Sequence, residues 1–240
     1  MPKVKTGNDW LKIARQQIDA LDARLLLQQV TGFAHTDLIC RPDAPLSEAT
    51  VKTLENLLQR RAAGEPLAYL IGETSFRGRP FKVTPAVLTP RPETEELVDV
   101  ALAKLHALQR SAPPPPEREV GSRSEGAVPK ESREKAYNDE ADKLRILDMG
   151  TGSGVIAISL ALEFPTAQVT ACDISPAALA IAEENAERLR ARARFLASDW
   201  FSALAGERFH LIVANPPYIA AADPHLAGDG LRFEPRLALT

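Results

Sequence analysis

Long apolar runs are missing from this sequence of 240 residues. It holds no stretch of 18 consecutive apolar residues and no basic start followed by an apolar segment, so neither a membrane span nor a secretory signal is predicted. Wholesale disorder is excluded as well, because 45% of the residues are hydrophobic and 25% are charged, as is ordinary for a globular chain. We therefore expect a soluble, cytoplasmic protein.

An excess of one charge is also missing. Lys and Arg number 29 against 32 Asp and Glu, a formal charge of -3, so the overall balance does not favour a polyanionic partner such as DNA. The two cysteines, Cys40 and Cys172, are too few for a disulfide scaffold and are expected to be small buried side chains. The four histidines form no pair at metal-ligand spacing, and no metal site is predicted.

The first part of the sequence has helical periodicity. Between residues 8 and 64, apolar residues recur at helical spacing, as in Ile18, Leu21 and Leu25, and Ser47 is placed to cap a helix that ends near Ala63. Residues 1–73 are therefore expected to form a small helical bundle. Two short alternating runs around a glycine at residues 75–83 then predict a hairpin, within a linker of residues 74–90.

Residues 109–143 differ from their surroundings. They contain four consecutive prolines and mixed charges, with almost no large apolar side chain. Such a stretch cannot bury enough surface to offset the entropy lost on ordering. We expect a disordered insertion here, with a charge-rich docking segment as the alternative.

Beyond this insertion the sequence alternates between strand and helix. Strands are expected at residues 144–149, 168–172, 193–197 and 209–214, and helices at residues 154–163 and 176–190. This order is typical of an α/β fold with a doubly wound parallel sheet and helices on both faces, in a domain of residues 91–240. A ligand is expected at the carboxyl ends of the strands.

A glycine-rich segment follows the first of these strands and leads directly into a helix. Its residues are Gly150, Thr151, Gly152, Ser153 and Gly154. Glycines allow a tight turn and a close approach of backbone to ligand, and the start of the helix offers free N–H groups. The spacing lacks the last glycine of the dinucleotide-binding pattern and the Gly-Lys pair of a phosphate-binding loop. NAD and ATP are therefore less favoured as ligands of this segment.

An acidic and an aromatic residue follow the next two strands. Asp173 stands 23 residues after Gly150, where a carboxylate can accept hydrogen bonds from both hydroxyls of a ribose. The alternative role for Asp173 is to cap the helix that begins at Pro176. Trp200 follows the third strand, and its flat ring suits an adenine, although it could equally belong to the core.

The most specific pattern is Asn215, Pro216, Pro217 and Tyr218, which follows the fourth strand. The two prolines fix the backbone and remove two N–H donors, which leaves carbonyl oxygens as rigid acceptors. Asn215 adds a side-chain acceptor. A simple turn is the alternative interpretation, but a turn requires neither the amide nor the aromatic ring.

These acceptors suit a substrate with an NH2 group on a planar carbon. Its nitrogen is a poor nucleophile because its lone pair is delocalised, and twisting an amide costs roughly 18–20 kcal/mol. If the Asn215 side-chain oxygen and the Pro216 carbonyl accept both N–H protons, the nitrogen can face an electrophile about 3–3.5 Å away. Tyr218 can lie against the planar group and offer its ring face to a sulfonium donor. Asn215 and Tyr218 are therefore the predicted catalytic residues.

Together these motifs resemble the class I S-adenosylmethionine-dependent methyltransferases that act on a planar amino group. Within that class the sequence is similar to the HemK/PrmC family, the glutamine N5-methyltransferases that modify peptide-chain release factors. The likeness covers nearly the whole length. Besides the loop and Asn-Pro-Pro-Tyr, it includes the segments at residues 64–72, 90–95, 198–201 and 232–235.

The resemblance implies a set of roles. The cofactor would be S-adenosyl-L-methionine, with its methionine part on residues 150–154, its ribose on Asp173 and its adenine near Trp200. Asn215, Pro216, Pro217 and Tyr218 would hold the substrate, with Asn215 also near the cofactor. That substrate would be the glutamine of the Gly-Gly-Gln motif of a class I release factor, docked with help from the helical domain, and nucleic acid and membranes would not be partners.

The sequence holds only four predicted strands of the sheet, fewer than the resembled fold has. We therefore expect a sheet that is apparently truncated at its C-terminal side, with an open edge beside the strand that ends near Asn215. Two other functions stay open. One is an adenine-N6 methyltransferase for DNA or RNA, since the same acceptors fit a flipped adenine. The other is a non-catalytic fragment that only binds a partner.

Overall fold

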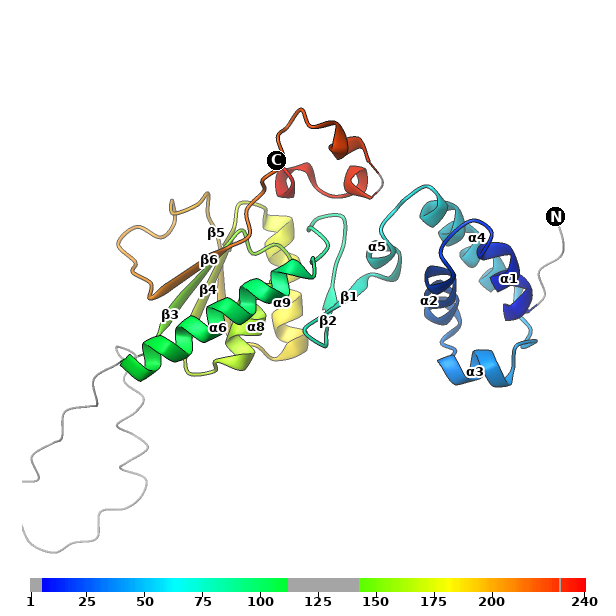
Figure 1. Cartoon of the computed structure of the whole chain (residues 1–240), viewed down its shortest axis with the longest axis horizontal. Coiled ribbons are helices and arrows are strands. Elements are labelled where there is room, and N and C mark those ends of the chain that lie inside the picture. The colour runs from blue at the N-terminus through cyan, green and yellow to red at the C-terminus, as the bar shows by residue number, and fades with distance from the viewer. Residues whose placement is uncertain (1–5, 112–142, 229) are drawn as a thin grey trace, which may run out of the picture. The chain divides into compact units, whose positions relative to one another are not determined.

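A computed structural model describes residues 6–111, 143–228 and 230–240 of the protein (Figure 1). Its internal contacts divide these residues into two units. One unit comprises residues 6–89 and 217–240, and the other comprises residues 90–216. The sequence predicted domain boundaries at residues 73 and 90, with residues 217–240 in the second domain. That division into folding units stays a prediction.

The first unit begins with a bundle of helices: α1 (Gly7–Ala14), α2 (Ala20–Thr31), α3 (His35–Cys40), α4 (Glu48–Ala62) and α5 (Leu67–Ile71). Its core contains Trp10, Leu26, Leu27 and Leu54, each at most 1% exposed. The Ser47 hydroxyl accepts a hydrogen bond of 3.1 Å from the Thr50 N–H, which confirms the predicted cap of α4.

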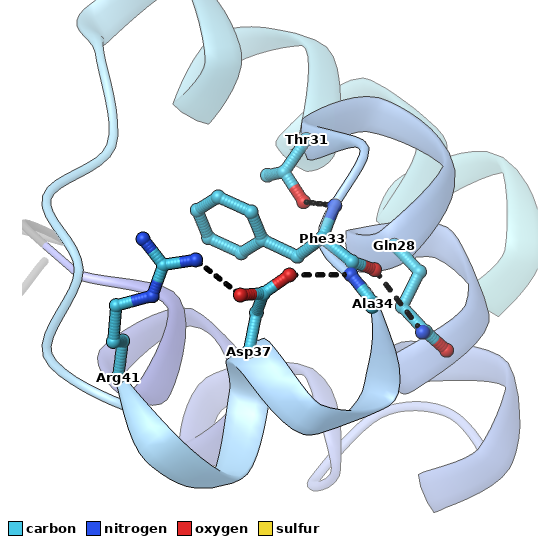
Figure 2. Close-up of polar contacts among 6 residues, drawn as sticks. All are labelled: Gln28, Thr31, Phe33, Ala34, Asp37 and Arg41. Atoms are coloured by element: carbon cyan, nitrogen blue, oxygen red, sulfur yellow. Dashed lines mark hydrogen bonds and ion pairs between the residues drawn. The ribbon is translucent and has the colours of Figure 1, made fainter.

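The corner between α2 and α3 is fixed by side chains that satisfy backbone groups (Figure 2). The Gln28 amide donates to the Phe33 carbonyl at 3.1 Å, and the Thr31 hydroxyl accepts from the Phe33 N–H at 3.2 Å. Asp37 accepts from the Ala34 N–H at 2.9 Å and pairs with Arg41. The hydrogen bond from Arg41 keeps the pKa of Asp37 below its usual value. Because α3 buries no residue, these polar contacts help to hold it in place.

A hairpin follows the bundle, as predicted. Strands β1 (Glu73–Phe76) and β2 (Arg79–Lys82) pair antiparallel, and the rings of Phe76 and Phe81 meet edge to face with centroids 6.0 Å apart. Residues 217–240 form the short 3-10 helices η3 (Pro224–Ala227), η4 (Leu231–Phe233) and η5 (Arg236–Ala238). The buried Glu234 accepts from the Thr89 N–H at 3.3 Å, and Arg232 donates to the Ala63 carbonyl. These bonds explain why residues 217–240 belong to this unit.

The second unit is an α/β layer structure. It contains α6 (Glu93–Ser111), β3 (Arg145–Met149), α8 (Val155–Glu163), β4 (Gln168–Asp173), α9 (Pro176–Leu189), β5 (Ala193–Ala197) and β6 (Leu211–Ala214). The four strands are parallel and lie in the order β5-β4-β3-β6. The predicted α/β fold with its parallel sheet is therefore confirmed. Two boundaries were wrong: α6 continues through residues 109–111, and β6 begins at Leu211 instead of residue 209. Within the expected insertion, residues 112–142 lie outside the described residues.

The helices that the structure describes in this unit cover one face of the sheet. The α8 residue Ala157 donates its N–H to Asp148 on that face, α9 contacts α8, and α6 contacts α8 and β6. This single layer follows from two right-handed crossovers that run in the same direction, from β3 to β4 and from β4 to β5. Figure 1 shows these helices on one side of the strands and the segment after β5 on the other.

That segment supplies the cover of the second face. Leu204 packs on Leu147, Met149 and Cys172, whereas Ile212 of β6 is 46% exposed. We expected helices on both faces, and the part of the chain described here has one helical layer. The strand β6 is an edge of the described sheet.

The expectation for the cysteines holds for one of the two. Cys172 is buried in β4, and burial raises the pKa of its thiol. Cys40 is exposed, because α3 lies on the surface of the bundle. Among the described residues, no helix combines the length and apolar character needed to cross a membrane.

Candidate active site

The carboxyl ends of the parallel strands bring together most of the predicted site residues. The glycine-rich loop follows β3, Asp173 ends β4, Trp200 lies just beyond β5, and Asn215 follows β6. Met149 pairs with Ala214, so the loop and Asn215 leave adjacent strands side by side. This edge is where ligands bind in open α/β sheets.

The loop has the backbone that its glycines predict. Gly150 and Gly152 have φ angles of +70° and +56°, a region that side chains other than glycine rarely adopt. A Cβ placed on either residue meets no atom within 4 Å. Open space therefore faces this part of the loop, which leaves room for a ligand against the backbone.

Neighbouring elements hold the loop in place. The Cys172 carbonyl accepts from the N–H groups of Gly150 and Thr151, at 2.9 and 3.0 Å. From α9, the fully buried Asn185 donates its amide to the Ser153 carbonyl at 2.9 Å. The loop is thus bonded to β4 and α9 before any ligand arrives.

Beneath the loop lies Asp148, a carboxylate that is 0% exposed. Its Oδ2 accepts from the Thr151 hydroxyl at 2.6 Å and from the Ala157 N–H at 3.1 Å. Its Oδ1 is buried and has no hydrogen-bond partner in the described structure. Burial raises the pKa of Asp148 to about 6. The Thr151 hydroxyl is used by Asp148, and its N–H and carbonyl are bonded to Cys172 and Gly154, so Thr151 mainly holds the loop in shape.

Asp173 links the loop to the start of α9. Its Oδ2 accepts from the Gly152 N–H and its Oδ1 from the Ser175 N–H, both at 2.9 Å. The cap of α9 is Ser175, whose hydroxyl accepts from the Ala178 N–H at 3.2 Å. The alternative of Asp173 as the helix cap was therefore wrong, and each of its oxygens keeps a lone pair for another donor.

Trp200 is 56% exposed at the tip of β5, so the alternative of a core position for its ring was wrong. Its φ angle of +49° is unusual for a bulky residue. The Ser198 hydroxyl donates to the Trp200 carbonyl at 2.7 Å and helps to hold this conformation. The ring is left accessible beside the strand that carries Asp173.

Asn215 is oriented by a residue from α6. Its Nδ2 donates to the hydroxyl of Thr94 at 3.3 Å, and Thr94 is only 6% exposed. With the amide nitrogen used in this way, the Oδ1 oxygen is the part of the side chain available to a substrate N–H. Pro216 is exposed and belongs to the same unit.

The remaining two residues of the Asn-Pro-Pro-Tyr pattern belong to the other unit. Pro217 is exposed, and Tyr218 is 85% exposed. Their roles in holding a substrate stay predictions, as do those of the other site residues.

Sequence reasoning missed three residues that shape the site: Thr94, Asp148 and Asn185. Asn185 left a signal, because it interrupts the apolar face of α9 formed by Ala178, Ala182 and Ala186. Thr94 lies in the segment 90–95 that carried part of the family resemblance, and Asp148 directly precedes the loop region. Their contacts depend on the fold and could not be deduced from spacing.

Comparison with known proteins agrees with this architecture. A family model described as Methyltransferase small domain matches residues 136–227, and one described as PrmC N-terminal domain matches residues 5–72. Three relatives that are all named release factor glutamine methyltransferase come from Bordetella pertussis, Burkholderia pseudomallei and Escherichia coli. Their identities to this chain are 45%, 47% and 40%.

The alignments extend over nearly all of this chain and most of each relative. They cover 95%, 93% and 96% of the chain, and 73%, 69% and 73% of the respective relatives. Both the helical bundle and the α/β unit are included in this similarity. On this evidence, the chain belongs to the release factor glutamine methyltransferase family.

Proposed function

We propose that this protein transfers a methyl group from S-adenosyl-L-methionine to the side-chain amide nitrogen, N5, of the glutamine in the Gly-Gly-Gln motif of class I peptide chain release factors. Membership of the family supports the reaction and the protein class of the substrate. The residues at the carboxyl edge of the sheet support the roles given below.

The residues after β3 and β4 fit the cofactor. Space lies open in front of Gly150 and Gly152, and the loop is already fixed by bonds to β4 and α9. Asp173, which accepts from the Gly152 N–H, offers carboxylate acceptors beside that space. When bound there, S-adenosylmethionine supplies an electrophilic methyl group on a positively charged sulfur. Residues 150–154 and Asp173 would hold it, with Trp200 at its adenine end.

The acceptors after β6 would activate the glutamine amide. The Oδ1 of Asn215 would accept one N–H proton, and the Pro216 carbonyl would accept the other, which directs the nitrogen lone pair away from its own carbonyl. No bond among the described backbone groups uses the Pro216 carbonyl. Tyr218 would lie against the planar amide. Because the amide proton becomes acidic once the nitrogen is alkylated, this arrangement needs no strong base.

The observation that carries the proposal is the fixed amide of Asn215. It follows the strand paired with β3 and has its nitrogen bonded to Thr94, so its oxygen is presented to a substrate beside the glycine-rich loop. A preorganised acceptor of this kind contributes most when it is aimed at the reacting group.

The proposal is tested with methyl-labelled S-adenosylmethionine and a purified class I release factor, with the label located by mass spectrometry. We expect one methyl group on the Gly-Gly-Gln glutamine. The Asn215→Ala variant should lose on the order of 10² to 10³ in turnover while cofactor affinity, measured by calorimetry, changes much less.

Two controls separate the other functions. A release factor with Ala in place of that glutamine should accept no label, and an adenine-containing oligonucleotide offered instead should stay unmodified. Transfer to the oligonucleotide would favour the adenine-N6 alternative. Cofactor binding without transfer to any of these would contradict the proposed substrate, and absence of cofactor binding would favour the non-catalytic alternative.

A further inference from the structure

A basic groove lies at the end of the sheet opposite the glycine-rich loop. It has a volume of about 790 Å³ and is lined by the amino-terminal ends of β3, β4 and β5 and by the end of α8. Five of its lining residues are cationic: Lys143, Arg145, Arg190, Arg192 and Arg194.

Acidic side chains of the described residues balance these charges only in part. No Asp or Glu lines the groove, and the carboxylate of Glu207 bonds to Arg145 at 2.6 Å and to Arg194 at 2.9 Å. No ion pair is recorded for Arg190 or Arg192 with any residue that the structure describes, and both are exposed. On a chain with a formal charge of -3, this is a local concentration of positive charge.

The arrangement of the cations suits repeated anionic groups. Arg192 and Arg194 alternate with alanines, and in extended chain two such residues point the same way about 6.6 Å apart. Arg145 is held by Glu207 and lies over the Phe209 ring, with its guanidinium carbon 5.1 Å from the centroid. Guanidinium groups bind phosphate through two parallel N–H bonds.

The rest of the lining offers neither aromatic anchors nor a platform for stacking bases. No aromatic side chain lines the groove, and its apolar members are mostly small. Aromatic anchors are the usual high-energy contacts of protein interfaces, and aromatic platforms are what stack bases. A ligand in this groove would therefore be held through its charge, without apolar anchoring or base stacking.

We propose that the basic groove binds the phosphate groups of a polyanion, supplied either by the backbone of an RNA strand or by a free polyphosphate chain. This inference concerns a different part of the chain from the methyl-transfer site and does not depend on the proposed function. Arg190, Arg192 and Lys143 would make the main contacts, with Arg145 and Arg194 beside them.

The test uses the full chain, a fluorescent oligouridine of about 12 nucleotides and tripolyphosphate as competitor. Fluorescence anisotropy should show saturable binding. The logarithm of the binding constant should fall with the logarithm of the salt concentration, with a slope of roughly 0.7 for each phosphate contacted. Displacement by tripolyphosphate identifies the phosphate groups as the ligand. Direct calorimetric binding of tripolyphosphate without RNA binding would also support the site and would assign it to free polyphosphate.

Variants locate the binding. Arg190→Asn with Arg192→Gln should weaken binding at least about tenfold and lower the salt slope by roughly 1.4, since two contacts are removed. Asn suits position 190, where φ is +57°. The control Arg15→Gln removes an exposed charge from the helical bundle and should bind like the parent chain, and the unfolding midpoint of each variant checks its fold.

Three results would overturn the proposal. The first is absence of binding by both probes at low salt. The second is equal loss of affinity in the groove variant and in Arg15→Gln, which would indicate a general charge effect. The third is binding of polyglutamate as tight as that of tripolyphosphate, which would indicate an acidic peptide as the ligand.

Discussion

The hydrogen bond between Thr94 and Asn215 places an otherwise unremarked hydroxyl next to the proposed chemistry. Thr94 comes from α6, 121 positions before Asn215 in the sequence. Without this bond the amide of Asn215 could rotate and present its nitrogen, a donor, where the substrate needs an acceptor. Thr94 is therefore a positioning residue for the proposed reaction.

Replacing Thr94 with Val keeps the shape of the side chain and removes the acceptor. We expect Thr94→Val to lower kcat on the order of tenfold, since one hydrogen bond contributes about 1 kcal/mol or somewhat more. Cofactor affinity should be nearly unchanged, and Thr94→Ser should restore turnover. Steady-state kinetics would contradict this role if the Val and Ser variants behaved alike.

The buried Asp148 predicts an unusual dependence of stability on pH. Its pKa is about 6 in the folded chain, against 3.8 for an ordinary aspartate, so the folded state holds this proton more tightly than the unfolded state does. The stability that results is fully present below the unfolded pKa and is lost as pH rises through about 6. Most carboxylates in folded proteins act in the opposite direction.

This effect is isolated by comparison with Asp148→Asn, which cannot titrate. The free energy of unfolding of the parent relative to the variant should fall by on the order of 2 to 3 kcal/mol between pH 4 and pH 7.5. Urea unfolding at several pH values measures it. A difference that is constant across this range, or that grows with pH, would show that the carboxylate is not stabilised in its protonated form.

Sequence reasoning reached some of these residues and not others for a physical reason. Gly150 and Asn215 directly follow strands and Asp173 ends one, and the carboxyl ends of parallel strands in one sheet share one edge. Thr94 and Asn185 act through contacts that the packing of α6 and α9 creates. Such contacts leave no local pattern in the sequence, except that Asn185 is a polar residue on an apolar helix face.

At the scale of elements, the close packing of α8 on α9 rests on Gly154. A Cβ there would lie 2.8 Å from Ile158 Cδ1 and 3.1 Å from Ala182 Cβ, and the φ angle is +83°. Gly154→Ala should therefore destabilise the chain by about 1–3 kcal/mol. It should also weaken cofactor binding, because the loop and the start of α8 must shift together.

A second substitution distinguishes crowding from backbone strain. Ile158→Val removes the Cδ1 atom that a Cβ at position 154 would strike, so the double variant should recover part of the lost unfolding free energy in a urea titration. Gly152→Ala is the matched case, since a Cβ there meets no atom and only its φ angle opposes the change. Identical losses in the double variant and in Gly154→Ala would show that contact with Ile158 Cδ1 is not the cause, which leaves the φ angle and the contact with Ala182.

The order of helices and strands was predictable because each has its own period and its own boundary residues. Ser47 and the glycine of the hairpin mark ends that the structure confirms. The second face of the sheet was not predictable, because Leu204 covers it from a segment without regular structure. The end of α6 was missed because residues 109–111 precede the prolines and stay helical despite their polar composition.

At the scale of the whole molecule, we expect an exposed apolar side chain on an edge strand of the described sheet to promote association. Ile212 is 46% exposed on β6, which is unpaired on its outer side in the described sheet. Such edges template pairing with other chains. We expect concentration-dependent association in sedimentation velocity, and Ile212→Thr should reduce it.

A matched variant makes this prediction specific. Ile39 is 66% exposed on α3 of the helical bundle, where no strand edge is present. Ile39→Thr removes a similar apolar area and should leave the association unchanged. Equal effects of the two variants would mean that general surface hydrophobicity, and not the strand edge, drives association.

The contrast between the two tryptophans of the chain has an optical consequence. Trp10 is 1% exposed in the bundle core, and Trp200 is 56% exposed beside the proposed adenine position. In Trp200→Phe the remaining emission should be blue-shifted and should report the melting of the bundle. In Trp10→Phe the emission of Trp200 should be quenched by acrylamide, and bound S-adenosylmethionine should reduce this quenching. The protein thus carries two intrinsic fluorophores, one in each unit, whose signals can follow unfolding and ligand binding separately.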